Sequence, residues 1–472
     1  MTVVLAGWGG DRCASSRAGA PVSVITLLGF GTVVLLATAL LHGYLWRRLV
    51  RGTTDPGRAR RRLTLLAVVL GMLPVLAVLL RRTLPLDAAA PLDWIAYTWL
   101  GLAFYAFLTL LVLEPVRWIA GLWLGKDREN RTEVADRTEV VDRTEVADRT
   151  EVIVPSGARR VPRRHDEAAQ LEPGTAPEGG AVRQDGNVIA PASRRVFLAR
   201  SLAATAGVVA LGTAGTGAYL ANSAPVIRRV PVTLRGLDPA LDGLKIVTFS
   251  DAHLSSTYRG RRFERVVELV NEQRPDVVAV VGDLVDGGVS ELREEVAPLA
   301  DLVSAQGVFF VTGNHEYFVD TQEWMRHLPT LGVEVLRNER VPIRRGTATF
   351  ALAGLDDRPA QLSGVPGHGA DLDAALDGRD DSTPVVLLAH QPVMVDQARA
   401  AGVDLQLSGH THGGQLWPFD YLIRLDQPAV EGLSRHGDTQ LYVTAGAGYW
   451  GPPMRVGARP EVTVIELRSP GS

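Results

Sequence analysis

The chain has 472 residues, a length that suggests two or three regions and not one ordinary domain. Its formal net charge is −3, so the composition indicates no strongly basic surface for nucleic acid. The single cysteine, Cys13, excludes a disulfide within the chain and a zinc site built from several thiolates. Any metal site must therefore use histidine, aspartate, glutamate or asparagine.

Three apolar runs in the first quarter of the sequence predict membrane-spanning helices over 22–46, 63–80 and 94–113. A bilayer core about 30 Å thick needs about 20 apolar residues in a helix, which the first and third runs reach. The second run is short and holds Pro74, but arginine pairs bracket it. Three buried core helices are the alternative, which such long uncharged runs disfavour. We expect residues 1–124 to form a membrane region with three transmembrane helices.

Arginine placement predicts the orientation of these helices. The linker 47–62 carries seven arginines, whereas the linker 81–93 carries two arginines and two aspartates. By the positive-inside rule the first linker is cytoplasmic and the N-terminus lies outside. The third helix then returns the chain to the cytoplasm.

Residues 125–192 predict a low-complexity cytoplasmic linker. It contains a hexapeptide repeat, RTEVAD RTEVVD RTEVAD RTEV, whose charges balance and which has little apolar surface to bury. We expect this linker to be helical in part or disordered.

Residues 193–225 predict either a twin-arginine-like export signal or a plain fourth transmembrane helix. The stretch SRRVFL at 193–198 precedes a mildly apolar run, 202–220, that is rich in alanine, glycine and threonine. Both interpretations keep the arginines in the cytoplasm and bring the rest of the chain outside. The sequence thus predicts a multi-pass protein of the cytoplasmic membrane with an extracytoplasmic C-terminal domain.

Residues 226–472 predict an α/β domain. Short β-branched runs such as KIVTFS, DVVAVVGD and GVFFVTGN alternate with amphipathic helical patterns, and PVVLLAH, DLQLSGH, QLYVTAG and VTVIEL are further strands. Polar residues cluster where these strands end. Because the carboxyl ends of strands in an α/β sheet face one crevice, we expect these polar side chains to converge.

Five short motifs follow the predicted strands, in the order D-x-H, G-D-x-x-D, G-N-H-E, an isolated histidine and G-H-x-H. Each is weak alone, because a polar turn or a helix cap would explain it. Together they contain five of the ten histidines in the chain, and chance assembly of all five motifs is remote.

These motifs, which read DAH, GDLVD, GNHE, His390 and GHTHGG, resemble the metallophosphoesterases of the calcineurin-like superfamily. The resemblance covers roughly residues 228–468 and is strongest to the bacterial, membrane-anchored, twin-arginine-exported branch. It implies a four-layer α/β/β/α sandwich and a two-metal centre.

The residue types support the same chemistry. Two divalent ions about 3.5–4 Å apart clamp a phosphate and activate a water between them, and a short carboxylate such as Asp283 suits the bridging position. His410 and His412 alternate on a segment we expect to be extended, so they would serve different ions. Mixed nitrogen and oxygen ligation suits Mn, Fe, Zn or Co without choosing among them. The predicted metal ligands are Asp251, His253, Asp283, Asn314, His390, His410 and His412.

Other polar residues have predicted roles beside the metals. His315 follows a ligand and so can face the substrate as a general acid, the role that the resemblance also implies; a purely structural role is the alternative. We expect Asp286 and Glu316 to orient ligand histidines. Three further residues are candidates for substrate contact: Asp356, Asp357 and Arg455. Four aromatic residues either line a pocket or pack in the core: Trp417, Phe419, Tyr449 and Trp450.

The sequence therefore predicts a hydrolase at the outer face of the cytoplasmic membrane. It would cleave a phosphate mono- or diester with a water activated by two metals. Membrane proximity suggests a lipid or cell-wall-derived substrate. The alternative is a non-catalytic, membrane-tethered sensor that binds metal or phosphate.

Overall fold

The computed structural model describes residues 24–81, 83–148 and 194–471. Cys13 and positions 149–192 of the predicted linker lie outside the described residues. The chain divides into two compact units, one with the residues up to Leu110 and from Ala203 onward, and the other with Leu111–Leu202.

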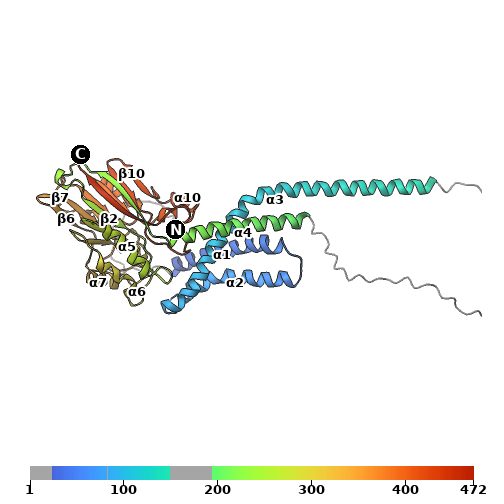
Figure 1. The fold of residues 1–472 in the computed structure, drawn as a ribbon, viewed down its shortest axis with the longest axis horizontal. Helices are drawn as coiled ribbons and strands as arrows, with labels where there is room; N and C mark the ends of the chain where they lie inside the picture. Colours follow the sequence, from blue (N-terminus) through green and yellow to red (C-terminus); the bar gives the residue numbers. More distant parts are fainter. Residues whose placement is uncertain (1–23, 82, 149–193, 472) are drawn as a thin grey trace, which may run out of the picture. The chain divides into compact units, whose positions relative to one another are not determined.

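Four helices precede the C-terminal domain (Figure 1): α1 (Val24–Leu45), α2 (Arg58–Leu80), α3 (Leu86–Asp148) and α4 (Arg194–Ala221). Among the described residues, three helical stretches are long and apolar enough to cross a membrane: Arg58–Leu80, Leu86–Ala120 and Arg194–Ala221. They contain the second, third and fourth predicted spans. Helix α1 occupies most of the first predicted span, whose first two residues lie outside the described part of the chain.

Helix α3 continues from the third predicted span into the predicted linker, which was expected to be helical in part or disordered. It runs for 63 residues and continues past residue 125 through most of the RTEVAD repeat. The repeat contains no glycine or proline, and it places Glu133 four residues before Arg137 and Glu139 four residues before Arg143, a spacing that stabilises helices. The local sequence of the repeat is therefore compatible with a helix that continues to Asp148.

Two six-stranded sheets form the C-terminal domain, which we call the two-sheet domain. The first has the order β1-β12-β2-β3-β4-β5 and the second β10-β11-β9-β8-β7-β6. The strands of the first sheet are β1 (Val226–Thr233), β12 (Glu461–Arg468), β2 (Lys245–Phe249), β3 (Val277–Val281), β4 (Val308–Val311) and β5 (Val333–Val335). Those of the second are β10 (Gly432–His436), β11 (Thr439–Val443), β9 (Leu405–Ser408), β8 (Val385–Leu388), β7 (Ala348–Gly354) and β6 (Glu339–Arg345).

Three apolar clusters make this domain four layers deep. The side chains of β3 alternate, with Val278 and Val280 in the cluster beneath the helices and Ala279 in the cluster between the two sheets. Because both faces of the sheet are buried at β3 and β4, these two strands are continuous apolar runs. The predicted α/β/β/α sandwich is confirmed. The helices over the first sheet are α5 (Gly260–Glu272), α6 (Val289–Val296) and α7 (Thr321–His327), and those beside the second are α8 (Leu372–Leu376) and α9 (Val395–Ala400).

A fourth cluster packs membrane-region helices of the first unit against the two-sheet domain. Helix α4 contributes Ala206, Ala210 and Ala214, spaced four apart on one face, where small side chains allow close approach. The two-sheet domain contributes Leu416, just before the short helix α10 (Phe419–Ile423), and Met454.

Parallel strands in register bring the motif loops to one edge. Val281 of β3 pairs with Val311 of β4, and Phe249 of β2 pairs with Val280 of β3. The segments that follow these strands therefore begin at the same level, and the predicted ligands lie two or three residues further on.

Candidate metal centre

The backbone of the predicted ligands is unusual. Asp251, His253, Asp283, His410 and His412 have φ angles of 51°, 49°, 51°, 71° and 53°. Residues other than glycine rarely adopt this left-handed conformation, and such strained positions concentrate at functional sites. The expectation that His410 and His412 share an extended segment is wrong. The chain turns sharply at both residues, and His412 begins a short 3₁₀ turn.

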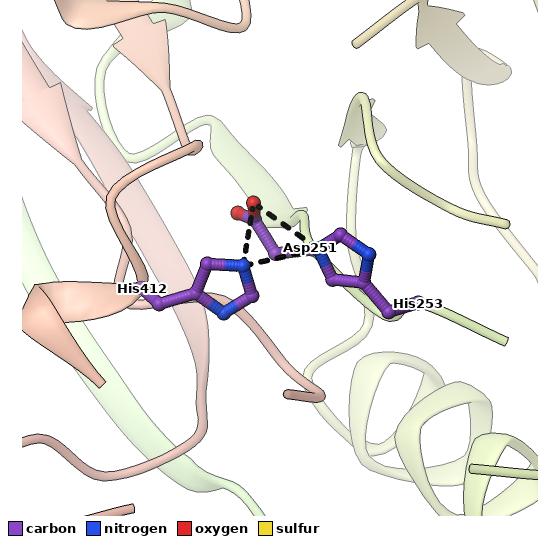
Figure 2. Close-up of side chains that lie close together, drawn as sticks. All are labelled: Asp251, His253 and His412. Carbon is purple, nitrogen blue, oxygen red and sulfur yellow. Dashed lines mark hydrogen bonds and ion pairs between the residues drawn. The ribbon is translucent and has the colours of Figure 1, made fainter. Parts of the chain in front are cut away.

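The first group of candidate ligands contains Asp251, His253 and His412, whose ligand atoms lie within 4.8 Å of one another (Figure 2). The two histidine Nε2 atoms are 3.0 Å apart. Oδ1 of Asp251 lies 3.9 Å from Nε2 of His253 and 3.5 Å from Nε2 of His412. Two ring nitrogens and one carboxylate oxygen therefore converge from loops that are 159 residues apart.

The second group contains Asp283, His390 and His410, also with ligand atoms within 4.8 Å. Nδ1 of His390 donates a hydrogen bond to the Val281 carbonyl at 2.8 Å, which leaves Nε2 as the ring nitrogen that could bind a cation. That Nε2 is buried, lies 3.1 Å from Oδ2 of Asp283, and has no hydrogen-bond partner of acceptable geometry. The buried Oδ1 of Asn314 is also unpartnered.

These unpartnered atoms fit a cation. A buried polar atom without a partner loses its hydration without compensation, so native proteins rarely keep one. Nε2 of His390 and Oδ1 of Asn314 are both lone-pair donors of the kind that bind divalent metals. Both belong to the seven metal ligands that the sequence predicted.

Asp283 lies between the two groups. Its Oδ2 is 3.1 Å from Nε2 of His390 in one group and 3.8 Å from Nε2 of His253 in the other. Its Oδ1 accepts the backbone N–H of His315 at 2.8 Å. The carboxylate is thus placed for a bridging role.

Burial and neighbouring charges favour ligand-ready protonation states at Asp283, His410 and His412 but not at His390. Burial lowers the pKa of His390, but Asp283 outweighs this and raises it well above its usual value, so a cation would have to displace the proton from Nε2. Burial raises the pKa of Asp283, but His390 and His315 outweigh this and hold that pKa well below its usual range. Burial, helped by the charge of His390, lowers the pKa of His410 to about 3. Burial also places the pKa of His412 well below its usual value. Asp283 is therefore an anionic carboxylate, and His410 and His412 are neutral imidazoles, at neutral pH.

Two glycines allow the loops to approach. A Cβ atom at Gly409 would overlap Ser250 and Asp251, and one at Gly313 would overlap the carboxylate and backbone of Asp283. Any larger residue there would push the motif loops apart.

His315 sits beside the first group. Its Nδ1 bonds to Oδ1 of Asp286 at 2.7 Å, and its ring lies 5.3 Å from Phe318 and 5.5 Å from Trp450. Burial lowers its pKa, but Asp283 and Asp286 more than compensate and raise it to about 9. The imidazole is therefore protonated at neutral pH and has a proton to give.

Of the two acidic residues expected to orient histidines, only Asp286 does so. Its Oδ1 also accepts from Nδ1 of His253 at 2.9 Å, which leaves Nε2 of His253 as the ligand atom. Glu316 contacts backbone instead, accepting the N–H groups of Asp283, Leu284 and Gly313. The sequence could not distinguish these roles, because both residues are carboxylates at the end of a motif, Asp286 in GDLVD and Glu316 in GNHE.

The expectation that Arg455 contacts substrate is wrong. Its side chain is fully buried and donates to the carbonyls of His412, Ala445 and Gly448, while its Nη2 lies 3.3 Å from Nδ1 of His412. It therefore holds together the loops that carry one ligand.

The two aspartates predicted to reach substrate are also buried. Asp356 forms a two-point ion pair with Arg337, at 3.0 and 2.8 Å. Asp357 accepts from Gln391 at 2.9 Å through Oδ2, and its Oδ1 is unpartnered. Burial raises the pKa of Asp357 to about 6.

The four aromatic residues divide between core and surface. Tyr449 is buried in the cluster beneath α5, and Phe419 stacks on Phe104 of α3 with ring centroids 5.1 Å apart. Trp417 and Trp450 are exposed.

One residue near the site carried no sequence signal. Nη2 of Arg81, which directly follows α2, donates to the backbone carbonyl of Asp286 at 2.5 Å and lies 3.8 Å from its Oδ2. The two residues are 205 positions apart, so only the fold brings them together.

Comparison with known proteins agrees with this geometry. The family model for calcineurin-like phosphoesterases matches residues 244–414. A transmembrane protein with a metallophosphoesterase domain from Danio rerio is 42% identical over 258 residues, which are 53% of this chain but only 59% of that protein. An uncharacterised metallophosphoesterase of Helicobacter pylori is 37% identical over 277 residues, 58% of this chain and 72% of that protein. One of Bacillus subtilis is 31% identical over 287 residues, 59% of this chain and 98% of that protein. On these matches, the chain belongs to the calcineurin-like metallophosphoesterase family.

Proposed function

We propose that the chain is a metal-dependent phosphoesterase that hydrolyses a phosphate mono- or diester. The observation that carries the proposal is the pair of ligand groups on either side of Asp283, with unpartnered donor atoms at His390 and Asn314. The calcineurin-like family uses a dinuclear divalent metal centre.

The residues divide into two ligand sets that share Asp283. The sets are Asp251, His253 and His412 for one cation, and Asn314, His390 and His410 for the other. Bound divalent cations polarise phosphoryl oxygens and lower the pKa of a water towards about 7. The nitrogen and oxygen donors suit Mn, Fe, Zn or Co.

His315 supplies the proton that the leaving group needs. Asp286 accepts from its Nδ1, so Nε2 is the ring nitrogen left for the substrate. The attacking water first gives a proton to solvent. As its oxygen bonds to phosphorus and the ester P–O bond breaks, Nε2 of His315 gives its proton to the departing alkoxide. The neutral imidazole that remains keeps its Nδ1 proton on Asp286, and solvent later returns a proton to Nε2 of His315.

We place the two-sheet domain at the outer face of the cytoplasmic membrane. The arginine-rich linker between α1 and α2 and the SRRVFL stretch at the start of α4 support this orientation through the positive-inside rule. The same stretch supports a twin-arginine-type export route and a place in the bacterial branch of the family. A substrate derived from lipid or cell wall follows from this location.

The test is an assay of the full chain, purified in detergent, on phosphate monoesters and diesters with Mn, Fe, Zn or Co. We expect hydrolysis that depends on added metal and is lost in His390→Ala. Turnover that survives exhaustive chelation would contradict the proposal. Stoichiometric metal binding without hydrolysis of any ester would instead favour the alternative, a non-catalytic, membrane-tethered sensor that binds metal or phosphate.

A further inference from the structure

An apolar surface extends along one short segment of the two-sheet domain. Trp417, Tyr421, Leu422 and Leu425 are 54%, 62%, 41% and 82% exposed, and α10 within this segment has no buried residue. Four large apolar side chains thus face outward within nine positions. We call these four residues the 417–425 surface. Isolated exposed leucines are ordinary on proteins, but clustered ones mark an interaction site.

The 417–425 surface is continuous with the membrane-region helices. The phenolic O–H of Tyr105 on α3 donates to the Trp417 carbonyl at 3.1 Å. Phe419, between the exposed residues, stacks on Phe104 of the same helix. Leu416, directly before the surface, belongs to the cluster that contains the alanines of α4. Because α3 and α4 contain candidate membrane spans, the segment packs directly on helices suited to lipid.

The composition of the segment suits a lipid surface. Tryptophan and tyrosine collect at the boundary between lipid and water, where their rings are buried and their polar atoms stay hydrated. Leucine side chains enter the acyl region, and a cation such as the exposed Arg424 can meet anionic head groups. A soluble protein partner would not explain why the surface adjoins the spanning helices.

The 417–425 surface also leads to the candidate metal centre. Its segment begins five residues after His412. Gln415 joins it to Trp450: Nε2 of Gln415 donates to the Trp450 carbonyl at 2.8 Å, and the Trp450 N–H donates to Oε1 of Gln415 at 3.0 Å. Trp450 is 48% exposed and its ring contacts His315. The segment that carries the surface is therefore linked, through Gln415, to an exposed ring beside the proposed proton donor.

We infer that the 417–425 surface docks the two-sheet domain on the bilayer, so that the metal centre acts on a phosphate ester held in that bilayer by a long apolar chain. The substrate class is thus an amphiphilic phosphate ester, with its phosphate at the centre and its chain in lipid. This inference rests on the proposed phosphoesterase function.

The activity test uses the full chain in phosphatidylcholine vesicles with manganese and two pairs of esters. One pair is p-nitrophenyl methyl and p-nitrophenyl hexadecyl phosphate, and the other is methyl and hexadecyl phosphate. We expect kcat/KM to be about tenfold higher or more for the hexadecyl member of the pair that is cleaved, because its chain partitions into the bilayer.

The variant Tyr421→Ser/Leu425→Ser should lower kcat/KM for the hexadecyl ester about fivefold or more through KM, because it loses apolar area that the bilayer would bury. Turnover of the methyl ester should stay within about twofold, since no reacting group changes. Val303→Ser, which alters an exposed apolar residue elsewhere on the domain, is the matched control and should change neither. Equal losses on both esters, or no loss on either, would overturn the inference.

A second readout does not need activity. Brominated phosphatidylcholine quenches tryptophan that touches its chains, so Trp417→Phe should reduce the quenching of the full chain. Trp324→Phe, at a buried position of α7, should not. Equal quenching of Trp417→Phe and the parent chain would contradict docking. A second result would also contradict docking: the parent chain is a dimer, and the Tyr421→Ser/Leu425→Ser variant is a monomer with unchanged lipid quenching. In that case a second copy of the chain, and not the bilayer, would cover the 417–425 surface.

The two proposals fail differently. If the parent chain cleaves the methyl ester but gains nothing from the hexadecyl chain, the docking inference fails and the phosphoesterase proposal stands. If it cleaves no ester under any metal, the phosphoesterase proposal itself fails, and with it the substrate class.

Discussion

The two-sheet domain buries its large apolar side chains, whereas the membrane-region helices expose many of theirs. In the two-sheet domain, Phe310, Leu352 and Leu407 are almost completely buried in clusters beside or between the sheets. In α2, Leu65 and Leu79 are 67% and 66% exposed. The same hydrophobic effect explains both, because the solvent of the second region is lipid and burial within the protein is not required.

The two regions also contribute different things to the protein: the two-sheet domain carries the candidate metal ligands, and the helices carry the candidate membrane spans. The predicted metal ligands all come from the two-sheet domain, at the ends of strands whose register the buried cores hold in place. The helical region contributes apolar length, together with polar contacts to the domain. Among the described residues these include Arg81 to Asp286, Asp87 to Arg259, Asp93 to Ser256 and Tyr105 to the Trp417 carbonyl. Of these four, the first involves a carboxylate that contacts the site histidines.

The sharpest way to test this separation is Asp283→Asn. It removes the charge shared by both ligand groups, so we expect activity to fall more than about 100-fold, beyond the 10- to 100-fold loss typical of residues that only orient ligands. Metal content, measured by mass spectrometry of the purified chain, should fall with it. Asp380→Asn changes an exposed aspartate and serves as the control. Full metal content and full activity in Asp283→Asn would remove the bridging role.

His315→Gln should have the next largest effect, and its size should depend on the leaving group. An alkyl ester needs a proton on its departing oxygen, so its kcat should fall by about 10²–10⁴. A p-nitrophenyl ester leaves as a stable anion and should lose far less. Uniform losses for both leaving groups would mean that His315 acts only by supporting the fold.

Core and lipid-facing leucines provide a stability test of the comparison. Leu352→Ala should lower the free energy of unfolding of the two-sheet domain by about 2–5 kcal/mol, because it opens a cavity between the sheets. Leu79→Ala, on the exposed face of α2, should leave that transition nearly unchanged. Thermal unfolding of the full chain in detergent measures both. Equal decreases in the unfolding temperature for Leu352→Ala and Leu79→Ala would contradict the distinction between a protein core and a lipid-facing helix surface.

The smallest effect should come from Arg81→Ala. The contact with Asp286 positions a carboxylate that itself holds His253 and His315, so we expect kcat to fall only several-fold, by less than about tenfold. Arg81→Lys should recover part of the loss, and Arg61→Ala, outside this contact, should cause none. A change in KM alone, or no rescue by lysine, would show that the helical region does not contribute to the geometry of the site.

The predicted strands and motif residues were recoverable because their signals are local. A strand buried on both faces is a continuous apolar run, and the polar residue that follows it marks the edge where ligands bind. Predicted strands such as DVVAVVGD and DLQLSGH correspond to β3 and β9. For the linker the sequence left two alternatives, helical in part or disordered, and α3 continues through its first 24 residues to Asp148.

By itself, the sequence determined the α/β alternation, the apolar spans and the list of residues able to bind metal, because period, length and residue chemistry are properties of a few neighbouring positions. The four-layer sandwich was implied by the resemblance of the motifs to a known family. Only the tertiary structure decided how those residues are used. It turned His410 and His412 into separate groups through left-handed backbone, moved Arg455 from substrate contact to loop support, and set Arg81 beside Asp286. Each of these depends on contacts between segments distant in sequence, which packing creates and local pattern does not encode.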